Sequence, residues 1–265
     1  MSTIDVFFQS IKLPVMPEVA HALIAAMNND NVSSHEVRSL IAKDAALTAR
    51  LLRLANSASF GLKRNVTTLD DAIALVGMER VRTLALAASI GDSFPTIKGL
   101  DRAEFWHSCM ACAGYGQWLA LQIGVDTNEA WLACMMVRLG ELLIAEAEPH
   151  ALAEIECLPL VPGCRWEREI RITGFSEGQI MAELARRWNF PNDIPRALDA
   201  AADPVAAKPF NRLAAVVHLA SLLADMPPSG PEMLDELPSD VVNALQLPGA
   251  WIKDKFPEPE SVATL

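Results

Sequence analysis

Helical spacing of apolar residues recurs along almost the whole chain, and this feature constrains the fold most strongly. In the segment 45–57, Leu47 and Leu51 fall on one side of a predicted helix, whereas the arginines of the segment point away from it. The alternation of β-branched and aromatic residues that is typical of strands persists nowhere, and aromatic residues make up only 6% of the chain. The sequence therefore predicts an all-α protein.

Capping patterns indicate where several of the predicted helices begin. A Ser or Thr followed three residues later by an acidic or amide side chain can satisfy the first free backbone N–H groups of a helix. The sequence contains three such pairs: Ser33 with Glu36, Thr68 with Asp71, and Ser176 with Gln179. Gly77 is a suitable stop for the helix that follows Thr68. Longer helices are expected at about 101–123, 126–147, 176–189 and 208–225.

The segment DSFPTIKGLD, residues 92–101, is the best candidate for a linker, because it combines proline, glycine and mixed polarity. A chain of 265 residues with 51% hydrophobic residues can fill one large core or two smaller ones. We therefore expect an N-terminal helical sub-bundle in residues 1–95 and a C-terminal helical bundle in residues 96–255.

The charge balance excludes some classes of partner. Lys and Arg number 22 and Asp and Glu number 33, which gives a net charge of −11. Binding to nucleic acid or to an anionic membrane surface requires clustered positive charge, so neither partner is expected. No apolar run has the length of a membrane span, and the first residues lack the pattern of a signal peptide. We expect a cytoplasmic protein.

The five cysteines predict buried thiols rather than disulfides or a metal site. Cys109 and Cys112 form a C-x-x-C pattern inside a predicted helix, without a second pair at the short spacing that zinc sites use. A metal site built from Cys109, Cys112, Cys134 and His107 is the weaker alternative. The sequence also lacks glycine-rich phosphate loops and the Gly-x-Ser-x-Gly pattern, so no cofactor is expected.

Three segments carry a resemblance to a known family: LPVMPEVAHALIAAMNND, IAKDAALTARLLRLANSASFG and LDDAIALVGMERVRTLALA. Together they resemble the HDOD (HD-related output domain) family of bacterial signalling proteins. The resemblance continues through the rest of the chain, which implies one HDOD domain over about residues 10–250. It implies an HD-like helical fold in two parts, an N-terminal bundle specific to HDOD proteins and a C-terminal degenerate HD-like bundle.

HD phosphohydrolases, to which HDOD proteins are similar, hold metal ions with His residues, a His-Asp pair and a later Asp. Such ions activate water toward phosphate esters. The resemblance places this pocket at His107, Val137, Arg138, Glu177, Ala201, Ala202, His218 and Ser221. Of these positions, only His107 retains the residue type of the ligand that it matches, and the His-Asp pair is replaced by Val137-Arg138. The resemblance therefore implies a lost metal site.

Arg138 further disfavours a metal ion at this position, because a guanidinium repels a second cation nearby. The segment around Arg138 is apolar on most faces, so we expect its side chain to be buried and to need carboxylate partners. Glu141 is a candidate along the helix, and Glu177 is a candidate across helices. Exposure of Arg138 to solvent is the alternative.

The sequence as a whole predicts a non-catalytic bacterial signal-transduction module that acts by protein–protein contact, in which apolar grooves between helices bind a partner helix. One alternative is a metal-dependent phosphohydrolase with atypical ligands, drawn from His107, Glu177, Asp199, Asp203 and His218. Residual phosphohydrolase activity stays open. Another alternative is a nucleotide-sensing domain, with a nucleotide second messenger as its ligand.

A basic group in the N-terminal sub-bundle is the candidate interaction surface for a protein partner in a signalling pathway. It consists of Arg50, Arg53, Arg64, Arg80 and Arg82. Its positive charge stands out against the acidic balance of the chain and suits an acidic protein or a phosphate-bearing nucleotide. A solvated face with salt bridges inside the helices is the alternative.

Overall fold

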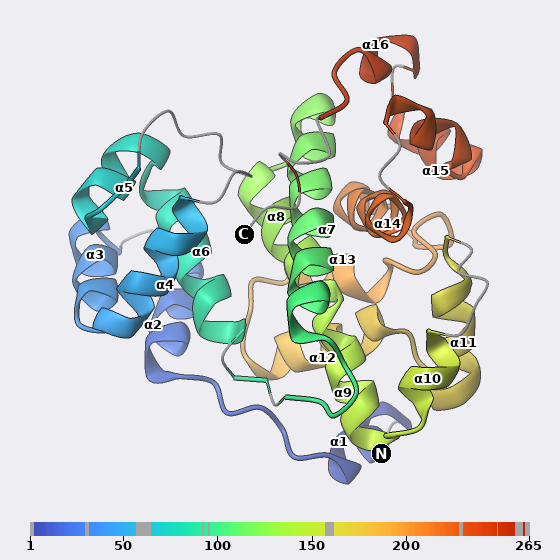
Figure 1. Ribbon diagram of the computed structural model, residues 1–265, viewed down its shortest axis with the longest axis horizontal. Coiled ribbons are helices and arrows are strands. Elements are labelled where there is room, and N and C mark those ends of the chain that lie inside the picture. The colour runs from blue at the N-terminus through green and yellow to red at the C-terminus, as the bar shows by residue number, and fades with distance from the viewer. Residues whose placement is uncertain are drawn as a thin grey trace.

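The structure, a computed structural model, contains helices and no strands among the residues that it describes, which confirms the all-α prediction (Figure 1). The described residues are 3–29, 32–56, 65–91, 93–94, 96–156, 162–227, 230–247, 249–257 and 262. The first part of the chain forms α1 (Thr3–Ser10), α2 (Glu18–Met27), α3 (Ser34–Ala42), α4 (Ala45–Ala55), α5 (Leu69–Val76) and α6 (Met78–Gly91). The middle forms α7 (Arg102–Ile123), α8 (Thr127–Val137), α9 (Leu139–Ala147), α10 (Ala151–Ile155) and α11 (Cys164–Thr173). The last part forms α12 (Glu177–Arg187), α13 (Asp193–Asp199), α14 (Arg212–Asp225), the 3-10 helix η2 (Pro231–Glu236), α15 (Ser239–Leu245) and α16 (Gly249–Lys253).

The three capping pairs read from the sequence are present. Ser33 accepts a hydrogen bond from the backbone N–H of Glu36, whose carboxylate accepts one from the N–H of Ser33. Ser176 and Gln179 form the same reciprocal arrangement at the start of α12, and Thr68 caps α5. The predicted stop at Gly77 is also confirmed, because α5 ends directly before it. The φ angle of Gly77 is 84°, in the region that favours glycine. These local signals set the helix starts correctly.

Helices α2, α3, α4 and α5 all pack against α6, at the left of Figure 1. Helix α6 is buried along almost its whole length and also packs against α8. It therefore joins the two groups of helices. The N-terminal α1 lies apart from α2–α6, because Asp5 forms an ion pair with Arg187 of α12 and the Arg187 guanidinium lies over the ring of Phe8. The boundary between residues 95 and 96 stays a prediction.

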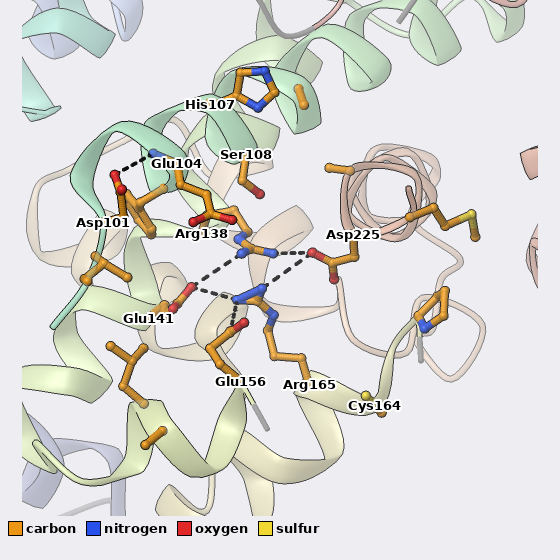
Figure 2. Close-up of a pocket in the computed structure, with 18 of the residues that line it drawn as sticks. Asp101, Glu104, His107, Ser108, Arg138, Glu141, Glu156, Cys164, Arg165 and Asp225 are labelled. Atoms are coloured by element: carbon orange, nitrogen blue, oxygen red, sulfur yellow. Dashed lines mark hydrogen bonds and ion pairs between the residues drawn. The ribbon is translucent and has the colours of Figure 1, made fainter. Parts of the chain in front are cut away.

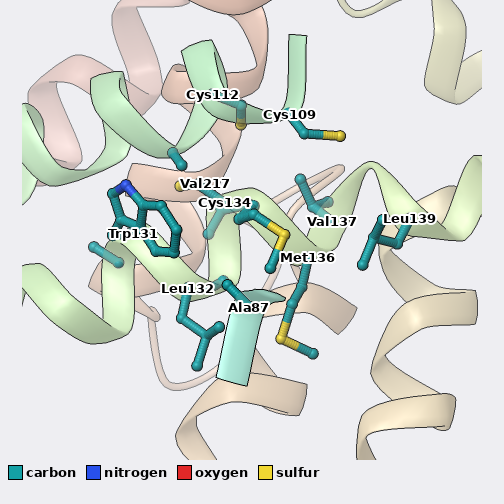
Figure 3. Packing of buried hydrophobic residues seen from close by; sticks show 14 of the residues in the cluster. Ala87, Cys109, Cys112, Trp131, Leu132, Cys134, Met136, Val137, Leu139 and Val217 are labelled. Carbon is teal, nitrogen blue, oxygen red and sulfur yellow. The ribbon is translucent and has the colours of Figure 1, made fainter. Parts of the chain in front are cut away.

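The core of the C-terminal bundle is formed by α7, α8 and α14, which pack closely along their lengths. Figure 3 shows Trp131 and Leu132 of α8 among side chains of α6, α7 and α14. Cys109, Cys112 and Cys134 are fully buried in this core. Burial raises the pKa of the Cys109 and Cys134 thiols, so these thiols stay protonated.

The predicted buried thiols are confirmed at these three positions. Cys164 is partly buried, and Cys157 lies outside the described residues.

The predicted helix 126–147 is wrong in one respect, since it is two helices that meet at Arg138. The backbone N–H of Glu141 bonds to the carbonyl of Arg138, which tightens the turn at the start of α9. This turn carries Gly140 against the first residue of α12: a Cβ on Gly140 would lie 2.0 Å from the carbonyl oxygen of Glu177. Because Gly140 has no side chain, α9 and α12 approach more closely here than they could with any larger residue.

Other differences concern short or late elements. The predicted helix 208–225 begins later, at Arg212, because the residues before it form a loop that ends at Asn211, the cap of α14. Helices α1, α10, α11, α13, α15 and α16 are short and were not predicted. Among the described helices, none is both long enough and apolar enough to cross a bilayer.

We predict that Gly140→Ala destabilises the protein, because the new Cβ would overlap backbone atoms of Glu177 and would force α9 and α12 apart. Overpacking of this kind costs about 1–3 kcal/mol or more. The melting temperature should fall by roughly 2–4 °C for each kcal/mol lost, measured by calorimetry. The control is Gly249→Ala, where the Cβ would meet no atom within 4 Å. Equal melting temperatures for the two variants would contradict the close approach.

Candidate functional site

A pocket of about 850 Å³ opens beside the start of α7 and is enclosed by α9, α10, α11 and the end of α14 (Figure 2). Its floor contains Arg138, Glu141 and Arg165, which are almost completely buried. His107 and Ser108 of α7 lie on one wall. The pocket thus combines a charged floor with an accessible opening.

Arg138 is buried, as predicted, with 5% of its surface exposed. Its Nη1 atom lies 2.6 Å from Asp225 Oδ1, its Nη2 atom lies 3.5 Å from Glu141 Oε2, and its Nε atom lies 4.0 Å from Glu177 Oε2. The predicted pairs with Glu141 and Glu177 are therefore confirmed as ion pairs. The shortest contact is with Asp225, the last residue of α14, which the sequence analysis did not identify.

A second arginine shares these partners. Arg165, near the start of α11, is 6% exposed. Its Nη1 atom lies 2.7 Å from Glu141 Oε2 and 3.1 Å from Glu156 Oε1, and its Nη2 atom lies 3.5 Å from Asp225 Oδ1. We call the six side chains the arginine–carboxylate cluster: Arg138, Arg165, Glu141, Glu156, Glu177 and Asp225. The cluster ties together α9, α11, α12 and α14 with the C-terminal end of α10.

The charges in the cluster shift each other's pKa. Burial and the neighbouring Arg165 oppose the charge of Arg138, but Asp225, Glu177 and Glu141 outweigh them and raise its pKa. Burial raises the pKa of Glu177 to about 7 against the opposing effect of the two arginines. Burial also raises the pKa of Glu156. The guanidinium groups therefore stay charged, whereas Glu177 changes its protonation state near neutral pH.

Glu169 of α11 extends the cluster inward. It is fully buried, and its Oε2 atom accepts a hydrogen bond of 2.7 Å from the backbone N–H of Glu177. Burial is the largest cause that raises the pKa of Glu169 well above its ordinary value, and the charge of the nearby Glu177 is the second. Glu177 Oε1 in turn accepts a hydrogen bond of 3.3 Å from the Trp166 indole. These contacts hold the first turn of α12 against α11.

The residue types in the cluster suit a divalent ion only in part, since carboxylates are good ligands for such ions. Here Glu141 and Asp225 are within ion-pair distance of both guanidinium groups. Among the described residues, no three or more His, Cys, Asp and Glu side chains are placed to hold a metal ion. The residues present therefore do not fit the metal ions of HD phosphohydrolases.

The structure separates most of the pocket residues that the resemblance implied. His107 and Arg138 line the pocket, and Glu177 lies behind Arg138. The others do not line it: Val137, Ala201, Ala202, His218 and Ser221. His218 accepts or donates a hydrogen bond of 2.8 Å at the Ala201 carbonyl and lies against the ring of Trp166, and Ser221 contacts Cys112.

The further donors of the hydrolase alternative lie apart as well. Asp199 pairs with Arg186 at 2.7 Å, and Asp203 accepts a hydrogen bond from the N–H of Ala206 in a turn.

The proposed basic surface requires a correction. Arg80 is 6% exposed, donates hydrogen bonds to Gln117 and Asn128, and lies over the ring of Trp131. Burial lowers its pKa to about 10. It is a core residue because α6 is covered on nearly every side.

The other members of the surface differ in their placement. Arg53 is exposed, Arg50 is partly exposed, Arg82 pairs with Glu79, and Arg64 lies outside the described residues.

Comparison with known proteins supports the resemblance. The model of the HDOD domain matches residues 13–204. A candidate phosphohydrolase from Shewanella amazonensis SB2B is 28% identical, with a TM-score of 0.73 over 92% of this chain and 85% of that one. An HDOD domain protein with unknown function from Geobacter sulfurreducens is 21% identical, with a TM-score of 0.72 over 98% of this chain and 91% of that one.

Two further proteins are longer than this chain. A candidate signal transduction protein from Marinobacter aquaeolei VT8 is 20% identical, with a TM-score of 0.75 over 96% of this chain and 57% of that one. An uncharacterized protein from Treponema pallidum (strain Nichols) is 25% identical over 187 residues, which are 69% of this chain and 36% of that protein. The chain thus spans about a third of the length of that relative. The two solved structures that are less than 25% identical to this chain show that it shares their fold.

We predict that the free energy of unfolding falls as pH rises from about 4.5 to about 7. In this interval folded Glu177 keeps a proton that the unfolded chain has released, so the folded state loses its advantage as the pH rises. The fall attributable to Glu177 is at most about 3 kcal/mol. Urea denaturation across this interval measures it.

The variant Glu177→Gln should make this dependence less steep, because glutamine cannot titrate, while Glu156 and Glu169, whose pKa values burial also raises, still contribute. The matched control is Glu183→Gln on the same helix, whose carboxylate pairs with Arg187 near the surface. A wild-type slope that survives in Glu177→Gln would contradict the assignment.

Proposed function

Because the chain belongs to the HDOD domain family, we propose that it is a non-catalytic regulatory module of bacterial signal transduction, which acts by contact with other proteins. The chain matches the family model over most of its length. The function rests on what the site offers chemically. Arg138, which the resemblance aligns with a metal ligand, shares carboxylate partners with Arg165, so the site holds two permanent positive charges.

The observation that carries the proposal is the buried contact of Arg138 and Arg165 with shared carboxylates. Glu141 and Asp225 each face both guanidinium groups at 2.6–3.5 Å. An incoming divalent ion would have to displace two cations or lie beside them, and both are costly at low dielectric. Metal-dependent hydrolysis needs such an ion to lower the pKa of a water molecule and make it a nucleophile.

The metal-dependent phosphohydrolase is the alternative, and the candidate phosphohydrolase from Shewanella amazonensis SB2B is the relative that favours it. This alternative requires that the helices rearrange, because Asp199 and Asp203 lie in contacts of their own and His218 bonds to the Ala201 carbonyl. The lost metal site is therefore the more economical interpretation.

Arg50 and Arg53 on α4 are the candidates for contact with an acidic partner protein. They belong to a helix that buries Leu47, Leu51 and Ala55. Arg80, which is buried, and Arg82, which pairs with Glu79, are weaker candidates. Complementary charge mainly guides and orients the approach of a partner.

One experiment tests the loss of catalysis. The purified chain is incubated with Mn²⁺, Fe²⁺, Zn²⁺ or Mg²⁺, desalted, and analysed for bound metal and for hydrolysis of phosphate monoesters and cyclic dinucleotides. We expect much less than one equivalent of metal and no turnover above buffer. Stoichiometric metal with turnover that is lost in Glu177→Gln would contradict the proposal.

A second experiment tests the contact surface. Affinity capture from lysate of the native cell compares the wild-type chain with the double variant Arg50→Glu/Arg53→Glu. The control is Lys12→Glu/Lys208→Glu, which makes the same change in net charge at exposed positions away from α4. We expect a specific protein to be lost only from the first variant. A partner retained by both variants would contradict the role of α4.

A further inference from the structure

The residues that follow α16 lie against α7. Beyond α16 the chain comes back to the upper end of α7 in Figure 1. Three described residues of this segment touch α7: Lys255, Phe256 and Val262. Phe256 is partly buried, and Val262 is only 4% exposed. We call this segment the tail, and we call Gly114, Tyr115 and Trp118 the tail-binding face of α7.

Gly114 makes room for the backbone of the tail. A Cβ on Gly114 would lie 2.6 Å from Val262 Cγ1 and 2.6 Å from the Val262 carbonyl oxygen, and the third-nearest atom also belongs to Val262. Glycine inside a helix weakens the helix relative to alanine. The first atoms that a larger side chain would meet are therefore those of the tail, which indicates that this glycine serves the contact with the tail.

Two aromatic rings of α7 hold Phe256. The Phe256 ring centroid lies 5.4 Å from that of Trp118, with the rings nearly perpendicular at 73°, and 5.9 Å from that of Tyr115. Edge-to-face pairs at such distances are favourable beyond the burial of apolar area. The Trp118 indole also donates a hydrogen bond of 2.7 Å to the Lys255 carbonyl. The face thus contacts an aromatic side chain and the backbone directly before it.

These contacts have the features of peptide recognition. Pro257 follows Phe256, and proline favours an extended backbone that loses little entropy when it binds an aromatic-lined surface. The bond from Trp118 reaches a backbone carbonyl, so it does not depend on the side chain at that position. All of these contacts come from a short segment, and a segment of another protein with the same residue pattern could make them.

The tail-binding face adjoins the pocket above the arginine–carboxylate cluster. Tyr115 contacts Phe256 and also belongs to the lining of the pocket. It is only 4% exposed. A segment that leaves or enters the face therefore changes the surroundings of a residue of the pocket.

We propose that the tail-binding face of α7 is an interaction surface for an extended peptide of a partner protein. The peptide carries an aromatic residue followed by proline, and a small branched apolar residue at the spacing of Phe256 and Val262. The tail occupies the face in cis and competes with the partner, since a tethered segment has an effective concentration of about millimolar. This inference rests on the proposed function as a contact module, but peptide binding is measured independently of metal content and turnover.

Fluorescence anisotropy of a labelled peptide with the sequence of residues 254–265, DKFPEPESVATL, provides the first test on the full chain. Val262→Asp places a carboxylate against α7 and releases the tail. We expect this variant to bind the peptide with a Kd lower than that of the wild type by on the order of tenfold or more, because the competitor in cis is weakened. The control Val205→Asp changes a valine that is 41% exposed and should bind like the wild type.

Phe256→Ala in the chain is a second variant that releases the tail, in case Val262→Asp folds poorly. Melting temperatures show which variants are folded. Peptide binding that improves in neither folded variant would overturn the proposal.

Adding Gly114→Ala to the variant with the released tail locates the site. The new Cβ takes the place of the peptide backbone, so the gain in affinity should disappear. Tyr115 is the only tyrosine of the chain, and its nitration by tetranitromethane is an independent measure. Release of the tail should accelerate the nitration, and the peptide should slow it again. Tight peptide binding that survives Gly114→Ala, or that leaves the nitration rate unchanged, would place the peptide elsewhere and overturn the proposal.

Discussion

The contact of two buried arginines with shared carboxylates is the interaction on which the C-terminal bundle depends. Arg138 lies at the junction of α8 and α9 and Arg165 lies on α11, and both reach the same oxygen atoms of Glu141 and Asp225. Removing charges from water costs several kcal/mol for each ion, and this cost is recovered only when partners are close and well oriented. The cluster therefore restricts α9, α11 and α14 to positions that keep every guanidinium beside a carboxylate. A shift of any one helix would leave a buried charge without a partner.

The same arrangement explains the shape of the site. The break at Arg138 turns α9 so that Gly140 touches the backbone of α12, which brings Glu177 behind the guanidinium. Above the cluster, the ends of α10 and α14 line the pocket between them. Because positive charge is supplied by arginine side chains, it is permanent and does not depend on the supply of a metal ion. This permanent charge supports the proposed role in recognition rather than in bond cleavage.

Local signals in the sequence predicted the local structure well. Contacts between distant residues could be predicted only where the resemblance to a family indicated them. The caps at Ser33, Thr68 and Ser176 depend on neighbouring residues, so they could be read directly. The pairing of Arg138 with Glu177 followed from the resemblance. Asp225 was missed because it closes a helix 87 residues away in sequence, and no spacing rule links such positions.

Two other misses have physical reasons. Arg165 lies on α11, a helix that was not predicted; the signal there was the spacing of Arg165 and Glu169, which lie on one buried face. Arg80 was placed on a surface because helical periodicity cannot show that α6 is covered from several sides. The direct test of the account is a double-mutant cycle for unfolding free energy with Arg138→Met and Asp225→Ala. We expect a coupling energy of about 2–3 kcal/mol, above the value of less than about 1 kcal/mol for the exposed pair Arg171 and Glu154. Additive effects at Arg138 and Asp225 would contradict the central role of the cluster.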